Sequence, residues 1–168
     1  LCSGQSTVLT ASGATSYTWS ANAGSATTNT VSVNPTTNTT YTVIGANAGG
    51  CMDTTTLTIS VNPTPTLAVN AAPGNICSGQ STVLSAGGAS NFTWTPGGLT
   101  TNTISVSPIV TTTYTVTGDS LGCTASQTVV VTVSATPTLT AVASQTTICA
   151  GQTTTLTATG ATNYTWTP

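Results

Sequence analysis

The five cysteines carry the most reactive side chains of this 168-residue chain, and they follow a repeated pattern. Cys2, Cys77 and Cys149 each begin a Cys-x-Gly-Gln motif, 75 and 72 residues apart, whereas Cys51 and Cys123 each follow a glycine. We therefore expect the disulfides Cys2–Cys51 and Cys77–Cys123, one bridge per repeat, with Cys149 unpaired in this segment. On the chain-entropy model such a bridge contributes about 4 kcal/mol, which matters in a unit with a small core.

Other roles for these cysteines have less support from the sequence. Free buried thiols are the simplest alternative, and zinc binding is disfavoured because no cysteine pair has ligand spacing and the chain contains no histidine. Cys2-Ser3-Gly4-Gln5 also has the Cys-x-x-Gln spacing of internal thioesters in some host-defence proteins. The competing interpretation is that the cysteine pairs and the glutamine caps a turn.

Catalysis is not expected from this composition. Asp53 and Asp119 are the only acidic residues, and lysine, arginine and histidine are absent. General acid–base chemistry needs titratable groups close to one another, and the abundant Ser and Thr hydroxyls have no base to activate them. Calcium prefers six or more oxygen ligands, more than one hairpin offers here. We predict no enzymatic activity, no cofactor and no metal site.

The missing cations also limit the partners. Without lysine or arginine the chain cannot neutralise phosphates, so we expect no nucleic-acid binding and no docking on anionic membranes. No apolar run is long enough to cross a bilayer. Charged residues make up 1% of the chain, and a net charge of −2 opposes association only weakly. The composition suits a chain that lies beside copies of itself, although neutral drift would also produce it.

The repeat defines three expected units of about 72–75 residues. Residues 1–62 form a unit without its first strand, residues 63–135 a complete unit, and residues 136–168 the beginning of a third. The chain is expected to be a segment of a longer array, or else another chain supplies the missing strands by β-strand addition. Short proline-containing linkers such as Asn62-Pro63-Thr64-Pro65 predict a semi-rigid rod.

Each unit is predicted to be all-β. Thr-rich and β-branched residues alternate with period two, and no segment has helical spacing. Six or seven short strands in about 70 residues are typical of a β-sandwich. The expected strands are 6–11, 17–20, 30–33, 39–44 and 54–61 in the first unit, and 66–70, 81–86, 92–95, 102–107, 112–117 and 126–133 in the second.

The aromatic residues recur at matched positions. Tyr-Thr-Trp or Phe-Thr-Trp ends at Trp19, Trp94 and Trp166, and Tyr41 and Tyr114 begin a later strand. We expect these side chains to face the core, which leaves no aromatic platform for a carbohydrate; exposed tryptophans would revive that alternative. Frequent Thr-x-Thr triplets raise ice binding as another alternative, although twisted sheets rarely present a flat threonine array.

The motifs Cys-Ser-Gly-Gln-Ser-Thr-Val-Leu, Tyr-Thr-Trp-Ser, Thr-Thr-Tyr-Thr-Val and Gly-Cys together resemble bacterial Ig-like (PKD-like) repeats. These occur in giant surface proteins of gliding or predatory bacteria, commonly exported by type IX secretion. The resemblance implies tandem immunoglobulin-like sandwiches, in which Trp19, Trp94 and Trp166 match the core tryptophan. Tyr41 and Tyr114 resemble the tyrosine at the corner before the penultimate strand. The cysteines depart from antibody domains, because their bridge would tie one end of the sandwich.

Two short motifs match O-glycosylation acceptors in secreted proteins of the same bacterial group. They are Asp53-Thr54-Thr55 and Asp119-Ser120-Leu121, with Thr54 and Ser120 as the acceptor hydroxyls. Both motifs lie around the last hairpin of a unit, where exposure is expected. The alternative is an aspartate that bonds its own turn backbone.

These observations together predict a structural, extracellular role, since disulfides form in oxidising compartments. We expect a disulfide-braced shaft of an extracellular filament or giant cell-surface adhesin that attaches to surfaces or prey. Its predicted partner is an identical chain, with glycans or cell surfaces contacted through other parts of the protein. A carbohydrate- or ice-binding module is the alternative.

Overall fold

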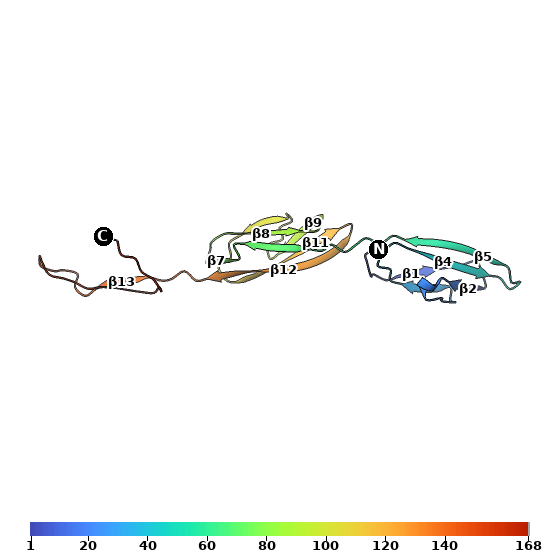
Figure 1. Ribbon diagram of the computed structural model, residues 1–168, viewed down its shortest axis with the longest axis horizontal. Coiled ribbons are helices and arrows are strands. Elements are labelled where there is room, and N and C mark those ends of the chain that lie inside the picture. The colour runs from blue at the N-terminus through green and yellow to red at the C-terminus, as the bar shows by residue number, and fades with distance from the viewer. Residues whose placement is uncertain (168) are drawn as a thin grey trace.

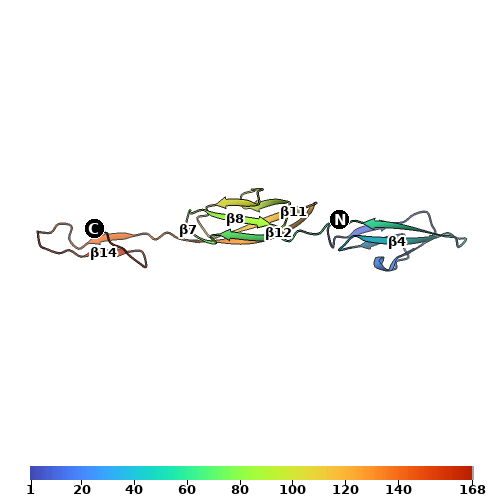
Figure 2. The ribbon, with the colours of Figure 1, turned by 45° about the horizontal axis from the view of Figure 1, so that its top comes forward.

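The computed structural model describes residues 1–167, so Pro168, the last residue of the expected third unit, lies outside the described residues. Three groups of strands follow one another along a rod, and two views show the same serial arrangement (Figures 1 and 2). We call them the first unit (β1–β5), the second unit (β6–β12) and the third unit (β13 and β14). Among residues 1–167 no helix is long and apolar enough to span a membrane.

The second unit is a sandwich of two sheets. One sheet has the order β10-β8-β6, and the other has the order β7-β12-β11-β9. All neighbouring strands are antiparallel except β7, which runs parallel to the end of β12. This is an immunoglobulin-like arrangement. The bounds are β6 Ala68–Ala72, β7 Asn75–Cys77, β8 Thr82–Gly87, β9 Asn91–Thr95, β10 Thr103–Val106, β11 Thr112–Ser120 and β12 Cys123–Ser134.

The core of the second unit forms because buried and exposed side chains alternate along its strands. In β8, Leu84 is fully buried whereas its neighbour Val83 is 44% exposed, because successive side chains point to opposite faces of the sheet. Trp94 on β9 and Val116 on β11 are fully buried from the opposite sheet. The buried cluster consists of Ile76, Leu84, Ala86, Phe92, Trp94, Ile104, Tyr114, Val116 and Val131.

The first unit repeats this plan with fewer strands. β1 Thr7–Thr10 pairs with β3 Thr30–Val33, and the second sheet has the order β2-β4-β5. The other bounds are β2 Ser16–Trp19, β4 Thr39–Ala46 and β5 Met52–Ile59, with a short 3-10 helix at Ala21–Ala23. Its buried cluster consists of Leu9, Trp19, Ala23, Val33, Tyr41 and Val43.

Each core tryptophan is fixed by a hydrogen bond as well as by burial. The indole nitrogen of Trp19 donates to the carbonyl oxygen of Thr28, and that of Trp94 donates to the carbonyl oxygen of Thr101, both at 2.9 Å. A buried indole N–H needs such a partner, and here the loop after the strand supplies it. The loop and the core therefore stabilise each other in both units.

The third unit differs from the sequence expectation for Trp166. The described part of this unit contains two strands, β13 Thr140–Ala143 and β14 Leu156–Thr159, which form one antiparallel pair. Trp166 is 53% exposed, so it is not a core residue in this structure. The physical reason is that residues 136–167 form no second sheet that could cover it.

The observed strands of the first two units overlap the expected ones, and two of the differences in their bounds concern the cysteines. The sequence did not predict β7 Asn75–Cys77, which is only three residues long and pairs with the end of β12. β11 and β12 extend to Ser120 and from Cys123, so the expected loop 118–122 shrinks to the two residues Leu121 and Gly122. Both differences lie where the cysteines are positioned.

We predict that Leu84→Ala lowers the free energy of unfolding of the second unit by about 2–5 kcal/mol, because it leaves a cavity in a fully packed core. Hydrogen exchange of peptides from β8 and β11, read by mass spectrometry, measures this loss locally. Val83→Ala, on the exposed face of the same strand, is the matched control and should cost less than about 1 kcal/mol. Equal losses for the two variants would contradict the assigned inward face.

Candidate functional site: the joint between the first and second units

The structure contains a disulfide between Cys2 of the first unit and Cys123 of the second. Their Cα atoms are 5.6 Å apart although 121 positions separate them in the sequence, and the Cα distance is normal for a disulfide. The expected pairs Cys2–Cys51 and Cys77–Cys123 are therefore wrong in this structure. The bond braces the joint between two units instead of closing one unit on itself.

The geometry of the strands explains why the expected pair cannot form. Cys2 forms a β-bridge with Asn62, which follows the end of β5, whereas Cys51 directly precedes the start of β5. At ~3.3 Å per residue, the extended chain from Cys51 to Asn62 places the two cysteines about 35 Å apart. No disulfide spans such a distance. The two cysteine positions of a unit thus lie at its opposite ends.

A tight turn presents Cys2 at the joint. The amide of Gln5 donates to the carbonyl oxygen of Cys2 at 3.0 Å, and the amide of Cys2 donates to the side-chain oxygen of Gln5 at 3.3 Å. Gly4 has a φ of +77°, which favours glycine at this position. Gln5 therefore caps the turn, and the Cys2 sulfur is engaged in a disulfide rather than in a thioester.

This turn is anchored to the rest of the first unit. The amide of Ser3 donates to the carbonyl oxygen of Asn62 at 3.0 Å, and the Ser3 hydroxyl donates to the carbonyl oxygen of Thr36 at 3.0 Å. The amide of Gly4 donates to the carbonyl oxygen of Pro35 at 3.1 Å. Each anchor uses backbone or a short side chain, so the position of Cys2 is rigid relative to its sandwich.

A two-residue hairpin presents Cys123. Ser120 and Cys123 are paired at the ends of β11 and β12, and the loop residues Leu121 and Gly122 have φ values of +55° and +78°. Positive φ at both central positions is the turn geometry that matches the twist of a hairpin. Cys123 is nearly fully buried. The hairpin therefore holds its sulfur at the end of the second unit that faces the first.

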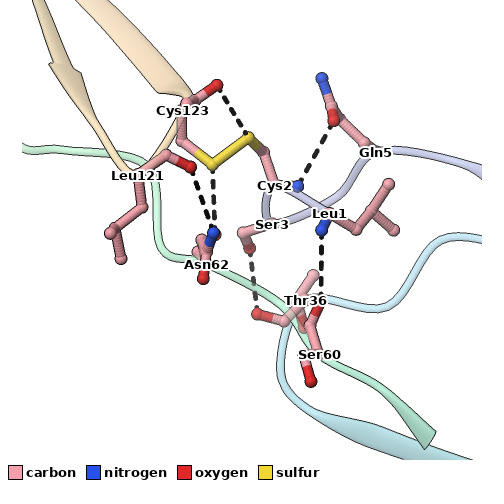
Figure 3. Close-up of a disulfide and its surroundings, with 10 residues drawn as sticks. Leu1, Cys2, Ser3, Gln5, Thr36, Ser60, Asn62, Leu121 and Cys123 are labelled. Atoms are coloured by element: carbon pink, nitrogen blue, oxygen red, sulfur yellow. Dashed lines mark hydrogen bonds between the residues drawn. A yellow bond between two sulfur atoms is a disulfide. The ribbon is translucent and has the colours of Figure 1, made fainter.

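Few other contacts connect the units at this joint. Figure 3 shows the disulfide with Asn62 and Leu121 beside it. The side-chain amide of Asn62 donates to the carbonyl oxygen of Leu121 at 3.2 Å. The sulfur of Cys2 lies 3.6 Å from the oxygen of Gly122, and that of Cys123 lies 3.8 Å from the oxygen of Asn62. These two are van der Waals contacts, since a disulfide sulfur has no proton to donate. The covalent bond is thus the principal restraint on the joint.

The remaining cysteines are free and exposed. Cys51 lies beside the β4–β5 hairpin, Cys77 ends β7, and Cys149 lies between β13 and β14. The expectation that Cys149 is unpaired agrees with this arrangement, whereas the expectation of bonded Cys51 and Cys77 does not.

The expected glycosylation positions differ in accessibility. Thr54 on β5 is exposed, and its amide bonds the Asp53 carboxylate at 2.9 Å. Ser120 is half-buried, and its hydroxyl oxygen accepts the amide of Ser90 at 3.0 Å. Both remain predicted acceptors, and Thr54 is the more accessible of the two.

A hollow of ≈ 480 Å³ lies beside the first sandwich, next to Ala14, Tyr17 and Gly45. At the matching place in the second unit a side chain occupies the space: a Cβ on Gly118 would lie 2.6 Å from the Leu67 side chain. Leu67 immediately precedes β6, which covers this edge of the second unit. In the second unit, Leu67 and β6 thus occupy the space that corresponds to this hollow.

The outer faces of the sandwiches carry rows of hydroxyl groups. Hydroxyl oxygens of paired strands lie 2.8 Å apart at Thr40 and Thr58, and 2.9 Å apart at Thr117 and Ser126. Cross-strand pairs of this kind stabilise a sheet while leaving its surface polar. Within residues 1–167 no group of three or more His, Cys, Asp or Glu residues could hold a metal ion.

Comparison with known proteins gives structural likenesses only. No family model and no curated protein matches the chain. A solved amphioxus IgVJ-C2 molecule is 21% identical, with 79% of this chain and 98% of that chain covered and a TM-score of 0.37. Three N-terminal domains of the bacteriophage RB49 outer capsid protein Hoc are 18% identical. The match covers 96% of this chain and 66% of that chain, with a TM-score of 0.37. Four N-terminal Ig domains of Dscam1 are 10% identical. The match covers 79% of this chain and 42% of that chain, with a TM-score of 0.34.

We predict that cleavage before the two aspartates reveals the disulfide directly. An endoproteinase specific for aspartate would release residues 1–52, 53–118 and 119–168. The Cys2–Cys123 bond keeps the first and third fragments together until a reducing agent is added, and the middle fragment is free. Mass spectrometry without reduction would instead find residues 53–118 linked to 119–168 if Cys77 bonded Cys123, and that result would contradict the joint described here.

Proposed function

We propose that this chain is a structural segment of an extracellular filament or giant cell-surface adhesin, where it acts as a disulfide-braced shaft for attachment to surfaces or prey. The observation that carries the proposal is the disulfide between serial sandwiches. A bond inside one sandwich would stabilise that unit alone, whereas a bond across the joint also restrains how one unit moves relative to the next. Such a brace suits a load-bearing rod.

The position of the bond determines how tension passes through the molecule. Force applied at Leu1 reaches Cys2 at once and continues through the disulfide to Cys123 and along β12. The 120 residues between the bonded cysteines, which are 121 positions apart, form a closed loop beside this path. These residues add no length to a stretched chain while the bond is intact, even if their sandwiches unfold.

The surface favours assembly with identical chains. Two acidic side chains and a formal charge of −2 leave little electrostatic repulsion between neighbours. The hydroxyl rows on β4, β5, β11 and β12 provide hydrogen-bonding groups along the rod. Lateral packing of sister chains into a filament therefore meets little electrostatic repulsion, and glycans or cell surfaces would be contacted by other parts of the protein.

An extracellular location is part of this proposal. A structural disulfide persists in oxidising compartments, and the repeat motifs resemble those of type IX-secreted surface proteins. The carbohydrate-binding alternative needs exposed aromatic side chains in a groove, but Trp19 and Trp94 are buried in the cores of their units. Trp166 is exposed, but the hollow of the third unit is lined by Pro137, Gly160, Ala161 and Thr162 and by no aromatic side chain. The structural role accounts for both the disulfide and the buried aromatics.

We predict that the disulfide limits how far the chain can be stretched. In single-molecule force spectroscopy with handles at the two ends, the intact molecule should extend to about 170 Å, since 48 of its 168 residues lie outside the loop. After reduction the same molecule should extend to about 600 Å, because all residues then contribute.

The matched control is the double variant Cys2→Ser/Cys123→Ser, which should reach the longer extension with or without reductant. A wild-type molecule that extends fully under oxidising conditions would contradict the proposed load path and, with it, the shaft function. The measurement concerns one molecule at a time, so it does not depend on assembly between chains.

A further inference from the structure

The longest strand of the second unit has a free edge. On one side, β12 pairs with β11 along Cys123–Val131, but on the other side β7 covers only its last three residues, Thr132–Ser134. Figure 1 shows β12, in orange, along the lower margin of this unit. Residues 124–131 therefore have no neighbouring strand on this side within the described part of the chain.

The register of the hairpin determines which backbone groups face this free edge. Ser120 and Cys123 close a two-residue turn, so the odd residues of β12 exchange hydrogen bonds with β11, and the even residues point their N–H and C=O groups to the other side. The amide of Thr132 has this direction, because it donates to the carbonyl oxygen of Gly74 at 2.9 Å. The even residues at the free edge are Thr124, Ser126, Thr128 and Val130.

The other strand edges of the second unit are covered or short. The loop after β9 folds back onto its edge, where the amide of Trp94 donates to the carbonyl oxygen of Leu99 and the amide of Gly98 donates to that of Trp94, both at 2.8 Å. The strands β7, β10 and β6 have only three, four and five residues. Proteins avoid association between sheets by covering or shortening edges in this way. The edge of β12 is thus the longest one that remains open in this unit.

The free edge of β12 also lacks the residues that usually protect an edge strand. Residues 124–131 include no charged residue and no proline, and their pairing with β11 is continuous, without a bulge. The side-chain oxygen of Gln127 accepts the amide of Thr128 at 3.3 Å, and this is a long bond between neutral groups. A partner strand can therefore replace it with a backbone carbonyl.

The matching strand of the first unit, β5, has a charged edge instead. Its even residues face the free side, as the amide of Asn62 shows by donating to the carbonyl oxygen of Leu1 at 2.8 Å. The carboxylate of Asp53 accepts the amide of Thr54 on this side at 2.9 Å. A bond to an ionised group is about twice as strong as a neutral one, and a charge at an edge opposes strand addition. We therefore expect β12, and not β5, to take up a partner strand.

We propose that two copies of this chain pair side by side through the free edges of their β12 strands. The inference rests on the proposed shaft function, and it names the surface through which identical chains pack. The occupant is a second copy because an uncharged edge offers backbone groups and small hydroxyl side chains alone, and each copy brings an edge of the same kind. Antiparallel pairing about a two-fold axis satisfies both edges at once.

The two ends of the free edge determine the register of this pairing. The β11–β12 turn of one copy must stop before it reaches β7 of the other, because β7 already lies beside Thr132. This condition places Ser126 opposite the Ser126 of the second copy, and Thr124 opposite Thr128. These are the residues whose N–H and C=O groups face the edge, so each opposed pair exchanges two hydrogen bonds. Gln127 releases the amide of Thr128 when the partner strand binds.

Amide hydrogen exchange, measured residue by residue by NMR, distinguishes edge pairing from packing of the sheet faces. The free thiols are first alkylated, so that no new disulfide forms. In a concentrated sample, in which sedimentation velocity finds the dimer, exchange at Thr124 and Ser126 should be at least about tenfold slower than in a dilute sample, because a partner strand accepts these protons. Val129 should be slow in both samples, since β11 already binds its amide. Thr56 on β5 should not change, because Asp53 protects that edge.

A pair of charge variants tests the same surface. Ser126→Lys places two cations directly opposite each other at the two-fold axis and should raise the Kd of the dimer at least about tenfold. Thr93→Lys is the matched control, because Thr93 and Ser126 lie on either side of Thr117 in one row of the sheet, and Thr93 is at the covered edge. This control should change the Kd less than about threefold. Slow exchange at Val129 in both variants verifies that the sandwich is folded.

Three results would overturn the inference. They are a chain that stays monomeric at millimolar concentration, a dimer in which Thr124 and Ser126 exchange as fast as in the monomer, and equal weakening by the two lysine variants. A dimer without protected edge amides would mean that chains pack through their sheet faces. The single-molecule test of the shaft uses isolated chains, so its outcome is independent of this one.

Discussion

A single covalent bond across a sparsely packed joint is the constraint on which the arrangement of the first two units depends. The polypeptide already crosses this joint after Asn62, and the Cys2–Cys123 disulfide adds a second connection beside it. Two tethers permit far fewer relative orientations than one. Apart from the disulfide, one side-chain hydrogen bond connects the units, from Asn62 to the carbonyl oxygen of Leu121. The relative orientation of the two units therefore depends on the disulfide more than on side-chain packing.

The turn at Cys2 and the hairpin at Cys123 hold the two sulfur atoms in position at the joint. The Cys2 turn is anchored by Gln5, Ser3 and Gly4, and the Cys123 hairpin is closed through Leu121 and Gly122. The turn and the hairpin each lie at one end of a sandwich, whose core fixes the strands that carry them. Burial of Trp94 and Val116 therefore contributes to the joint indirectly, because β9, β11 and β12 must keep their register for Cys123 to reach its partner.

In the proposed shaft, the nearly uncharged surface and the disulfide have different roles. Sandwiches of about 70 residues have small cores and gain much from covalent restraint. A bond between units restrains both the loop it closes and the angle of the joint, whereas a bond within one unit would restrain the loop alone. Hydroxyl pairs such as Thr40 with Thr58 keep the sheet surface polar without adding charge.

The sequence by itself determined the all-β class, the repeat and most strands, because alternation of Thr with apolar residues depends on neighbours two positions apart. It also placed Trp19 and Trp94 at positions that prove to be buried, since burial follows the same alternation. The disulfide partners depended on tertiary structure, because periodicity relates equivalent cysteines but does not say which end of a sandwich each occupies. Strand direction decided this: β5 separates Cys51 from Cys2 by its full length, and the serial stacking of units brings Cys123 to Cys2 instead.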